Sequence, residues 1–157
     1  MKDERNRNDA CAPLDPGDLR GSLGLLLRIA QVDVFEEFYR TLGPLGMKPG
    51  EFSVLWLIHL NPQVRQGALA GHLRIKRAHM TKLIRRFEAD GYVHRQTPDR
   101  DRRAVELSLT AKGRAFVTCN ADAVFDHIAT ETARLSPDEA DTLVALLQKF
   151  TGMEQPT

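Results

Sequence analysis

The sequence predicts a mainly α-helical fold that contains one small β-hairpin, and three observations indicate it. Apolar residues recur at helical spacing over most of the chain. The run from Arg65 to Val93 indicates two consecutive helices joined at about Arg74-Ile75, as in a helix-turn-helix motif. Two short alternating runs, one beginning at Tyr92 and one at residues 104–109, then indicate a pair of strands. A helix-turn-helix followed by a hairpin is a winged helix.

The length of 157 residues, with 42% apolar and 27% charged residues, suits one globular domain. Residues 1–17 are polar and contain prolines, which predicts a flexible N-terminal arm, and residues 18–157 form the domain. Within it we expect a winged-helix lobe at 45–110, with further helices at 18–44 and 111–150. The start of the chain lacks the apolar stretch of a signal peptide, and no run resembles a membrane span. The expected location is the cytoplasm.

Capping residues predict where the helices outside the helix-turn-helix motif begin. Asp18 is the expected N-cap of a first helix, and Pro49 is expected in the first turn of a second helix. Thr110 is expected to cap a long helix, and Ser136 with Glu139 forms a capping-box pattern before the last helix. The apolar positions of that last helix are Leu143, Leu146, Leu147 and Phe150.

The second helix of the helix-turn-helix motif has one apolar face and one basic face. Its apolar stripe, at i, i+3, i+4 and i+7, consists of Met80, Leu83, Ile84 and Phe87. A basic helix of this kind fits the major groove of DNA, where Lys and Arg side chains bind guanine edges and phosphates. A charged, solvated helix face is the alternative. The expected DNA-binding residues of this recognition helix are Lys76, Arg77, His79, Thr81, Lys82 and Arg85.

Between the two strands the chain reads P-D-R-D-R-R at residues 98–103. An arginine at the tip of a hairpin can enter a narrow minor groove, where the electrostatic potential is most negative. We expect Arg100 and Arg102 to contact DNA there, with Asp101 and Arg103 as braces, since carboxylates orient guanidinium groups through charge-assisted hydrogen bonds. A turn in which these charges neutralise each other is the alternative.

The charge distribution along the chain is uneven, although the net charge is only +1. Residues 65–114 contain 13 basic and five acidic residues, a net charge of +8, whereas the remaining residues contain nine basic and 16 acidic residues, a net charge of −7. A basic middle between acidic ends indicates that one side of the molecule binds a polyanion. A salt-bridged surface is the alternative.

The run LAGHLRIKRAHMTKLIRRFEADGYVHRQTPDRDRRAVELSLTAKG resembles the core of the MarR family of bacterial transcriptional regulators. The resemblance depends on F-E-x-x-G-Y-V at 87–93, D-R-R at 101–103 and L-T-x-x-G at 109–113, and it extends over about residues 18–150. The chain departs from the family pattern at the turn into the recognition helix. Arg74 and Lys76 stand there in place of a glycine and a small hydroxyl residue, which puts the N-cap in doubt and adds two charges near the phosphates.

The resemblance implies a homodimer that acts as a repressor by occluding a promoter. In the family, the first helix and the last two interlock between subunits to form a helical dimerisation lobe. The two winged lobes then meet the half-sites of a pseudo-palindromic operator in double-stranded DNA, on the bacterial nucleoid. The sequence agrees, because the terminal helices are apolar enough to need a partner and are too acidic to lie on DNA.

The resemblance also implies a small-molecule effector, often an aromatic acid or a phenolic compound, which binds between the two lobes and lowers the affinity for DNA. The residues NPQVRQGALA resemble members that regulate hydroxycinnamate catabolism and sense acyl-CoA thioesters, and arginines would suit the phosphates of CoA. Candidate ligand contacts are Arg28, Arg40, Trp56 and His59. Ordinary packing of Trp56 in the core and a hydrogen-bonded, partly buried His59 are the alternatives.

Other classes of protein have less support in the sequence. A cysteine-based redox-sensing regulator would use Cys11, in the arm, or Cys119, which is expected on a mostly buried path, and inert cysteines are the alternative. The five histidines do not form a metal-ligand cluster. No phosphate-binding glycine loop, HExxH or nucleophile elbow is present, so neither an enzyme nor a cofactor is expected. An architectural DNA-binding protein would bind with strong salt dependence and little sequence preference.

Overall fold

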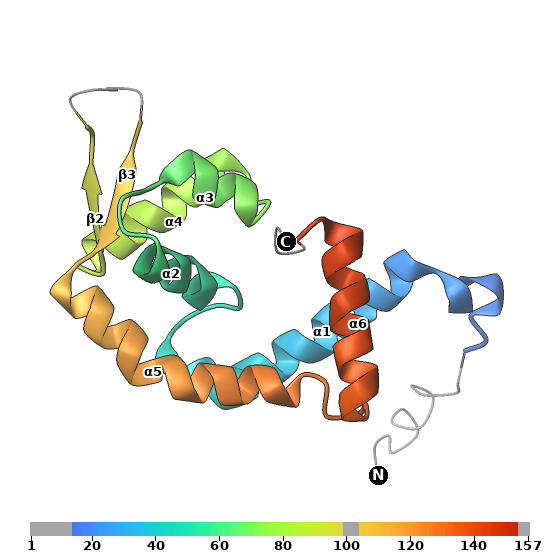
Figure 1. Cartoon of the computed structure of the whole chain (residues 1–157). Coiled ribbons are helices and arrows are strands. Elements are labelled where there is room, and N and C mark those ends of the chain that lie inside the picture. Colours follow the sequence, from blue (N-terminus) through green and yellow to red (C-terminus); the bar gives the residue numbers. More distant parts are fainter. Residues whose placement is uncertain (1–13, 99–103, 154–157) are drawn as a thin grey trace, which may run out of the picture. The chain divides into compact units, whose positions relative to one another are not determined.

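The computed structural model describes residues 14–98 and 104–153. The chain divides into two units, residues 1–36 and 37–157. The first unit contains the 3-10 helix η1 (Gly17–Gly21) and the beginning of α1 (Leu23–Leu42). The second unit contains the end of α1 and the remaining elements (Figure 1), which are η2 (Gly43–Leu45), α2 (Glu51–Leu60), β1 (Val64–Arg65), α3 (Gln66–His72), α4 (Arg77–Ala89), β2 (Val93–Gln96), β3 (Glu106–Leu109), α5 (Ala111–Thr130) and α6 (Pro137–Thr151).

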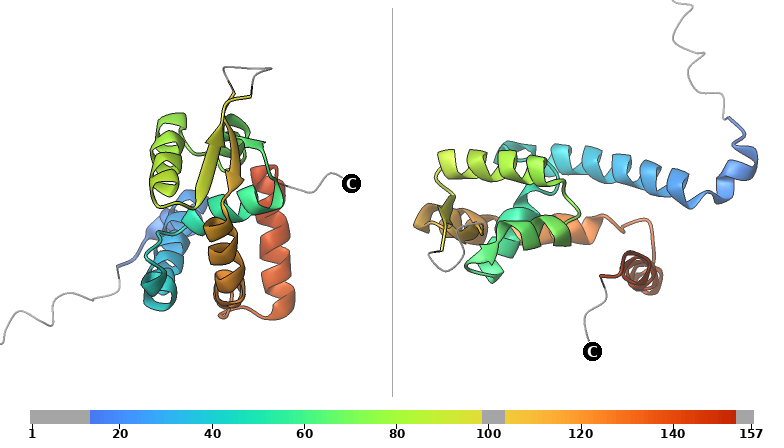
Figure 2. Two further views of the ribbon diagram at one scale, coloured as in Figure 1. Left: turned by 90° about the vertical axis from the view of Figure 1, so that its left-hand side faces the viewer. Right: turned by 90° about the horizontal axis from the view of Figure 1, so that it is seen from above.

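The strands form a three-stranded antiparallel sheet in the order β1-β3-β2. Strands β2 and β3 make the predicted hairpin, which lies beside α4 (Figure 2), and Val93 lies opposite Leu109 in its register. Strand β1 was not predicted, because a strand of two residues is too short to show an alternation of apolar and polar side chains. It pairs Val64 with Leu107, and the backbone N–H of Gln66 continues the ladder by donating to the carbonyl of Val105 at 2.8 Å. The sheet thus joins the start of the helix-turn-helix motif to the hairpin.

The core lies between α2, α4, α5 and the sheet. The predicted stripe of α4 is confirmed, since Met80, Leu83, Ile84 and Phe87 are all buried. They pack in one cluster with fully buried side chains of other elements, which are Val54, Leu55 and Ile58 of α2, Leu107 of β3 and Val117 of α5. Each such side chain stabilises the fold by about 1.5–3 kcal/mol relative to an exposed one, so this cluster fixes the position of the recognition helix.

Two of the predicted helix starts are wrong. Asp18 lies in η1, and the α-helix begins after Ser22, whose hydroxyl accepts a hydrogen bond from the backbone N–H of Leu25 at 3.4 Å. Pro49 precedes α2, because Gly50 occupies the N-cap in a left-handed conformation with φ +80°. A glycine adopts that conformation without steric cost. It therefore separates the proline from the first turn.

The other predicted caps are confirmed. Thr110 accepts a hydrogen bond from the N–H of Gly113 at 3.0 Å at the start of α5. Ser136 and Glu139 form a complete capping box at the start of α6, in which the Glu139 carboxylate accepts from the N–H of Ser136 at 2.9 Å. The end of α4 is followed by Gly91 with φ +77°. These local contacts fix where the long helices begin and where the recognition helix ends.

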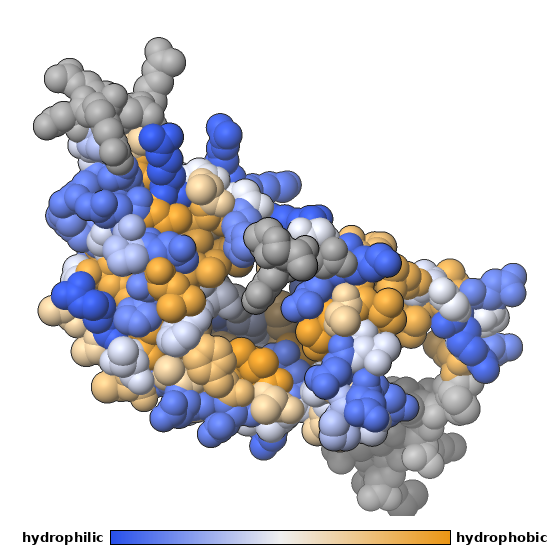
Figure 3. Space-filling model, viewed as in Figure 1, coloured by the Kyte–Doolittle hydropathy of each residue, from blue (hydrophilic) through white to orange (hydrophobic). Residues whose placement is uncertain are grey.

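The helices before and after the winged lobe leave many apolar side chains exposed. In the first unit, Leu23 and Leu26 of α1 are about half exposed. In the second unit, Leu146 and Phe150 of α6 are 60% and 66% exposed, and apolar surface gathers over this helix (Figure 3). The end of α1 is packed, because the hydroxyl of Thr41 lies 2.9 Å from Nδ1 of the buried His127 in α5. In the described ranges, no helix is long and apolar enough to cross a membrane.

Candidate nucleic-acid interface

Helix α4 presents a basic face on the side opposite its buried stripe. The predicted residues on this face are exposed; they are Lys76, Arg77, His79, Lys82 and Arg85. Because the stripe is anchored in the core, the helix cannot rotate to bury them. The positive charges are thus held at fixed spacing along a rigid helix, as required to bind a groove of DNA.

The turn that leads into α4 contains Arg74 and Lys76, the two residues that depart from the family pattern. Arg74 takes the position where a glycine would be favoured, and its φ is +52°. Lys76 is the N-cap, and its side chain makes no capping hydrogen bond. The first N–H groups of α4 therefore remain without a side-chain cap. Such N–H groups carry partial positive charge and bind phosphate oxygens well.

Thr81 differs from the other predicted residues of the recognition helix because it is half-buried and faces α3. Its hydroxyl donates to the carbonyl of Arg77 at 2.9 Å and accepts from Nε2 of Gln66 at 3.0 Å. Since the single hydroxyl proton is already donated, the Gln66 amide must donate here, and its Oε1 is buried without a partner. Gln66 therefore ties the start of α3 to the recognition helix. Sequence reasoning missed this contact, which joins residues 15 positions apart.

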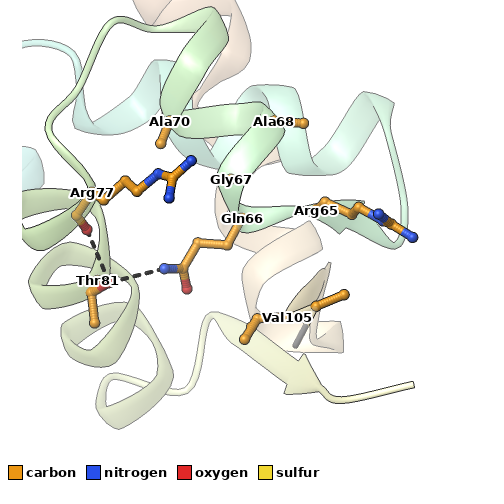
Figure 4. A pocket seen from close by; sticks show the side chains of 9 residues that line it. Arg65, Gln66, Gly67, Ala68, Ala70, Arg77, Thr81 and Val105 are labelled. Carbon is orange, nitrogen blue, oxygen red and sulfur yellow. Dashed lines mark hydrogen bonds between the residues drawn. The ribbon is translucent and has the colours of Figure 1, made fainter. Parts of the chain in front are cut away.

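The tie between Gln66 and Thr81 lies in a hollow of about 370 Å³ beside the recognition helix (Figure 4). The hollow is bounded by α3, α4, the end of β1 and the residues just before β3, and it brings Arg65 and Arg77 to the same surface as Val105. The basic surface of the lobe thus continues from α4 to the end of the hairpin at which β3 begins.

The hairpin carries the predicted wing. Its strand β2 is braced against α4, because the guanidinium of Arg95 pairs with the carboxylate of Glu88 at 3.3 Å. The predicted wing residues Arg100, Asp101, Arg102 and Arg103 lie outside the described residues.

The L-T-x-x-G residues hold the hairpin against α5. The Thr110 hydroxyl lies 2.6 Å from the carbonyl of Gly91, to which it donates, and it also accepts from Gly113. A Cβ atom at Gly113 would lie only 2.1 Å from the carbonyl oxygen of Tyr92, so no other residue fits there without a backbone shift. The motif residues therefore allow the hairpin and the first turn of α5 to approach each other closely.

Comparisons with known proteins agree with this geometry. The MarR family profile matches residues 47–105. A Thauera aromatica protein, described as a transcriptional regulatory protein for the hcr operon, is 32% identical over 151 residues, which are 96% of this chain and 91% of that protein. The chain belongs to the MarR family. It is a DNA-binding transcriptional regulator with a winged helix-turn-helix fold.

Solved MarR-family structures that contain DNA are similar to this chain. The transcriptional repressor CouR, bound to a 23-mer DNA duplex, superposes with a TM-score of 0.81 and 33% identity, over 89% of this chain and 99% of that chain. A MarR variant from E. coli complexed with operator DNA superposes with a TM-score of 0.76 and 26% identity, over 87% of this chain and 99% of that chain.

Two of the predicted effector contacts of this MarR-family chain, Trp56 and His59, lie side by side. The rings of Trp56 and His59 lie 5.6 Å apart, and the Trp56 ring also meets Phe125 edge-to-face at 4.8 Å. Arg40 is exposed and pairs with Glu37, and this hydrogen bond lowers the pKa of the Glu37 carboxyl. Arg28 is exposed on α1.

The residues considered for other regulatory chemistry are arranged differently from the expectation. Cys119 is exposed, so its predicted buried path is wrong. The reason is that α5 turns Val117 and Val124 toward the core, and Cys119 lies on another face of the helix. Cys11 lies outside the described residues. Among those described, no three His, Cys, Asp or Glu side chains are placed to hold a metal ion.

Proposed function

We propose that this chain is a homodimeric repressor that binds a pseudo-palindromic operator and leaves it when a small molecule binds. The observation that carries the proposal is the exposed basic face of α4, held in place by the buried stripe on its other side. A dimer with two such helices would reach two half-sites spaced about 34–36 Å apart along the DNA.

In this proposal the recognition helix enters the major groove. The exposed Lys76, Arg77, His79, Lys82 and Arg85 contact base edges and phosphates. Thr81 contributes less, because Gln66 and the Arg77 carbonyl already use its hydroxyl proton and one lone pair. The wing proposal depends on the sequence alone: Arg100 and Arg102 enter the minor groove, and Asp101 and Arg103 brace them.

The exposed apolar side chains of α6 support the homodimer. Leu143, Leu146 and Phe150 are between 42% and 66% exposed in the single chain. An apolar surface of this kind on a terminal helix is normally covered by a partner. In a two-fold dimer the same helix of each subunit would contribute to one interface. The regions proposed to dimerise are residues 18–44 and 111–150.

For the effector we propose an aromatic acid or its CoA thioester. The aromatic cluster around Trp56 and His59 offers ring faces and edges for an aromatic group. On the sequence alone, Arg28 and Arg40 are the proposed sources of positive charge for a carboxylate or phosphate. Arg40 would then exchange its exposed pairing with Glu37 for the ligand.

A gel-shift titration on the intergenic DNA upstream of the gene tests the proposal, with scrambled DNA as competitor. We expect competitor-resistant binding, which one member of a panel of aromatic acids and CoA thioesters releases. Specific binding that no compound releases would contradict the effector class. Equal binding to both DNAs would contradict the repressor and favour an architectural protein.

Two variants separate the proposed contacts. Lys82→Ala is expected to reduce discrimination between operator and scrambled DNA by about 1–3 kcal/mol, because it removes a base-edge contact. An equal loss on both DNAs would make Lys82 a phosphate contact.

Arg102→Ala is expected to weaken operator binding while the dimer, measured by sedimentation, stays intact. Unchanged affinity at physiological salt would remove the wing from the proposal.

A further inference from the structure

The turn between α3 and α4 contains a residue whose backbone is unfavourable for its type. Arg74 has φ +52°, in the left-handed region that favours glycine. In the described part of the chain, Gln63 is the other non-glycine residue with a positive φ. The turn itself is well bonded, since the N–H of Ile75 donates to the carbonyl of Ala70 at 2.9 Å. The backbone therefore gives no reason for an arginine in this position.

The side chain of Arg74 supplies a reason. Its guanidinium donates a hydrogen bond to the backbone carbonyl of Thr151, the last residue of α6. The last carbonyls of a helix have no partner within the helix and carry partial negative charge. After the left-handed Gly152, the N–H of Met153 turns back to the carbonyl of Gln148 at 2.9 Å. That turn does not reach the Thr151 carbonyl, which Arg74 binds instead.

The contact joins two elements that are 77 residues apart in the sequence. Arg74 precedes Lys76, the N-cap of the recognition helix, by two residues, and Lys76 makes no side-chain cap. The N-cap of α4 therefore has no hydrogen bond from its own side chain to the first turn of the helix. A displacement of the end of α6 would pull on the turn at the place where the recognition helix begins.

We propose that Arg74 is a positioning residue for DNA binding, which ties the end of α6 to the helix-turn-helix turn and so sets the start of the recognition helix. The proposal rests on the proposed use of the basic face of α4 to read an operator. The competing role for an arginine here is a direct phosphate contact. The geometry favours the tie, because the guanidinium is directed at the α6 carbonyl.

The variant Arg74→Gly separates these roles. Glycine removes the tie but accepts the left-handed backbone, so the fold is retained and circular dichroism should match the wild type. We expect operator affinity to fall about tenfold, within the usual range for coupled sites, while affinity for scrambled DNA and the salt slope of log Kd stay unchanged. A lost phosphate contact would instead weaken both DNAs and lower the slope by about one unit. That result would overturn the proposal.

Gln63→Gly is the matched control. It also introduces glycine at a left-handed residue, φ +63°, but the hydrogen bond there comes from the backbone N–H of Gln63 to Ser108 and is kept. We expect operator affinity to be unchanged in this variant. An equal loss in both variants would show that a general change in backbone flexibility is responsible, and would overturn the tie.

A second variant approaches the contact from α6. Gly152→Ala meets no atom within 4 Å, but alanine disfavours φ +68°, so the last turn of α6 and its Thr151 carbonyl should shift. We expect weaker operator binding in the wild-type background and no further loss in Arg74→Gly, since the tie is already absent. If the losses of the two single variants added up in the double variant, the tie would be overturned, but the proposed function would not. A wild-type chain without operator preference would overturn the proposed function as well.

Discussion

The winged-helix lobe and helix α6 contain apolar side chains of the same kinds, but they differ in how deeply these are buried. Leu55 and Ile84 in the lobe are 0% exposed, whereas Leu146 and Phe150 of α6 are 60% and 66% exposed. The lobe thus completes its hydrophobic core within one chain. Helix α6 is capped at both ends and yet leaves its apolar face open. The contrast indicates that local signals form the helix and that its stability in the folded protein depends on what covers that face.

The charges follow the same division. Residues 65–114, which contain α3, α4 and the hairpin, have a net charge of +8, and the rest of the chain has a net charge of −7. The closed lobe is therefore the part suited to DNA, and the open helices are the part suited to protein. Predictions can test this division from the largest expected effect to the smallest.

The largest effect is expected for Leu55→Ala. The side chain is fully buried in α2, and its removal leaves a cavity in the closed core. We expect the free energy of unfolding to fall by about 2–5 kcal/mol. Urea denaturation followed by circular dichroism at fixed protein concentration measures the change. A loss well below this range would mean that the lobe is not closely packed.

The contrasting change is Leu146→Ala in α6. For the dissociated chain we expect a change within about 0.5 kcal/mol, because the side chain is mostly exposed. In the proposed dimer the same variant should raise the dissociation constant of the two subunits. The range of protein concentration over which Tm changes should then lie higher for the variant than for the wild type. If Leu146→Ala cost as much as Leu55→Ala at every concentration, α6 would pack within its own chain, and the comparison would fail.

The next effect concerns Gly113, at the junction between the hairpin and α5. Alanine normally stabilises a helix by about 1 kcal/mol relative to glycine. Here the added Cβ would lie 2.1 Å from the Tyr92 carbonyl oxygen, so we expect Gly113→Ala to destabilise the lobe by about 1–3 kcal/mol. Gly71→Ala in α3 is the control, because no atom lies within 4 Å of its added Cβ, and it should be neutral or stabilising. Thermal unfolding of both variants gives the comparison, and the same sign in both would contradict the close approach.

Periodicity and short motifs predicted the parts of the fold that depend on local order. The stripe Met80, Leu83, Ile84 and Phe87 follows from helical spacing and is buried as expected. Thr110 and Ser136 cap the helices as their sequence patterns predict. Family resemblance identified Gly113 as part of a motif, and the structure supplies the physical reason, which is the approach of the Tyr92 carbonyl.

The features that the sequence did not predict depend on contacts between distant residues. Strand β1 exists because Val64 pairs with Leu107, and two residues alone show no alternation. The bond between Gln66 and Thr81 links two helices, so it has no local signature. The exposure of Cys119 depends on which face of α5 packs, and α5 has apolar residues on several faces. The proposed wing contacts lie outside the described residues, so only DNA-binding measurements can test them.

A smaller and more local effect than that of Gly113→Ala is expected at the start of α6, where the capping box fixes the first turn of the helix. Hydrogen bonds from the Ser136 backbone N–H and hydroxyl lower the pKa of the Glu139 carboxyl. A carboxyl whose pKa is lower in the folded state adds stability above its unfolded pKa, and this stability is lost as the pH falls through the folded pKa. Ser136→Ala removes the N-cap hydroxyl that accepts from the Glu139 N–H, and loss of such a cap should reduce stability by about 1 kcal/mol.

The pH dependence separates the charge from the cap. Glu139→Gln keeps a side chain that can accept from the Ser136 N–H but cannot titrate. We expect the wild type and Glu139→Gln to differ at neutral pH and to converge in acid, where the Glu139 carboxyl is protonated. Urea unfolding at a series of pH values measures this difference, and the other carboxyls cancel because both proteins contain them. A constant difference at every pH would mean that the Glu139 charge does not contribute. The uncharged hydrogen bonds of the capping box would then hold the start of α6, and the helix would depend even more on the partner that covers its open face.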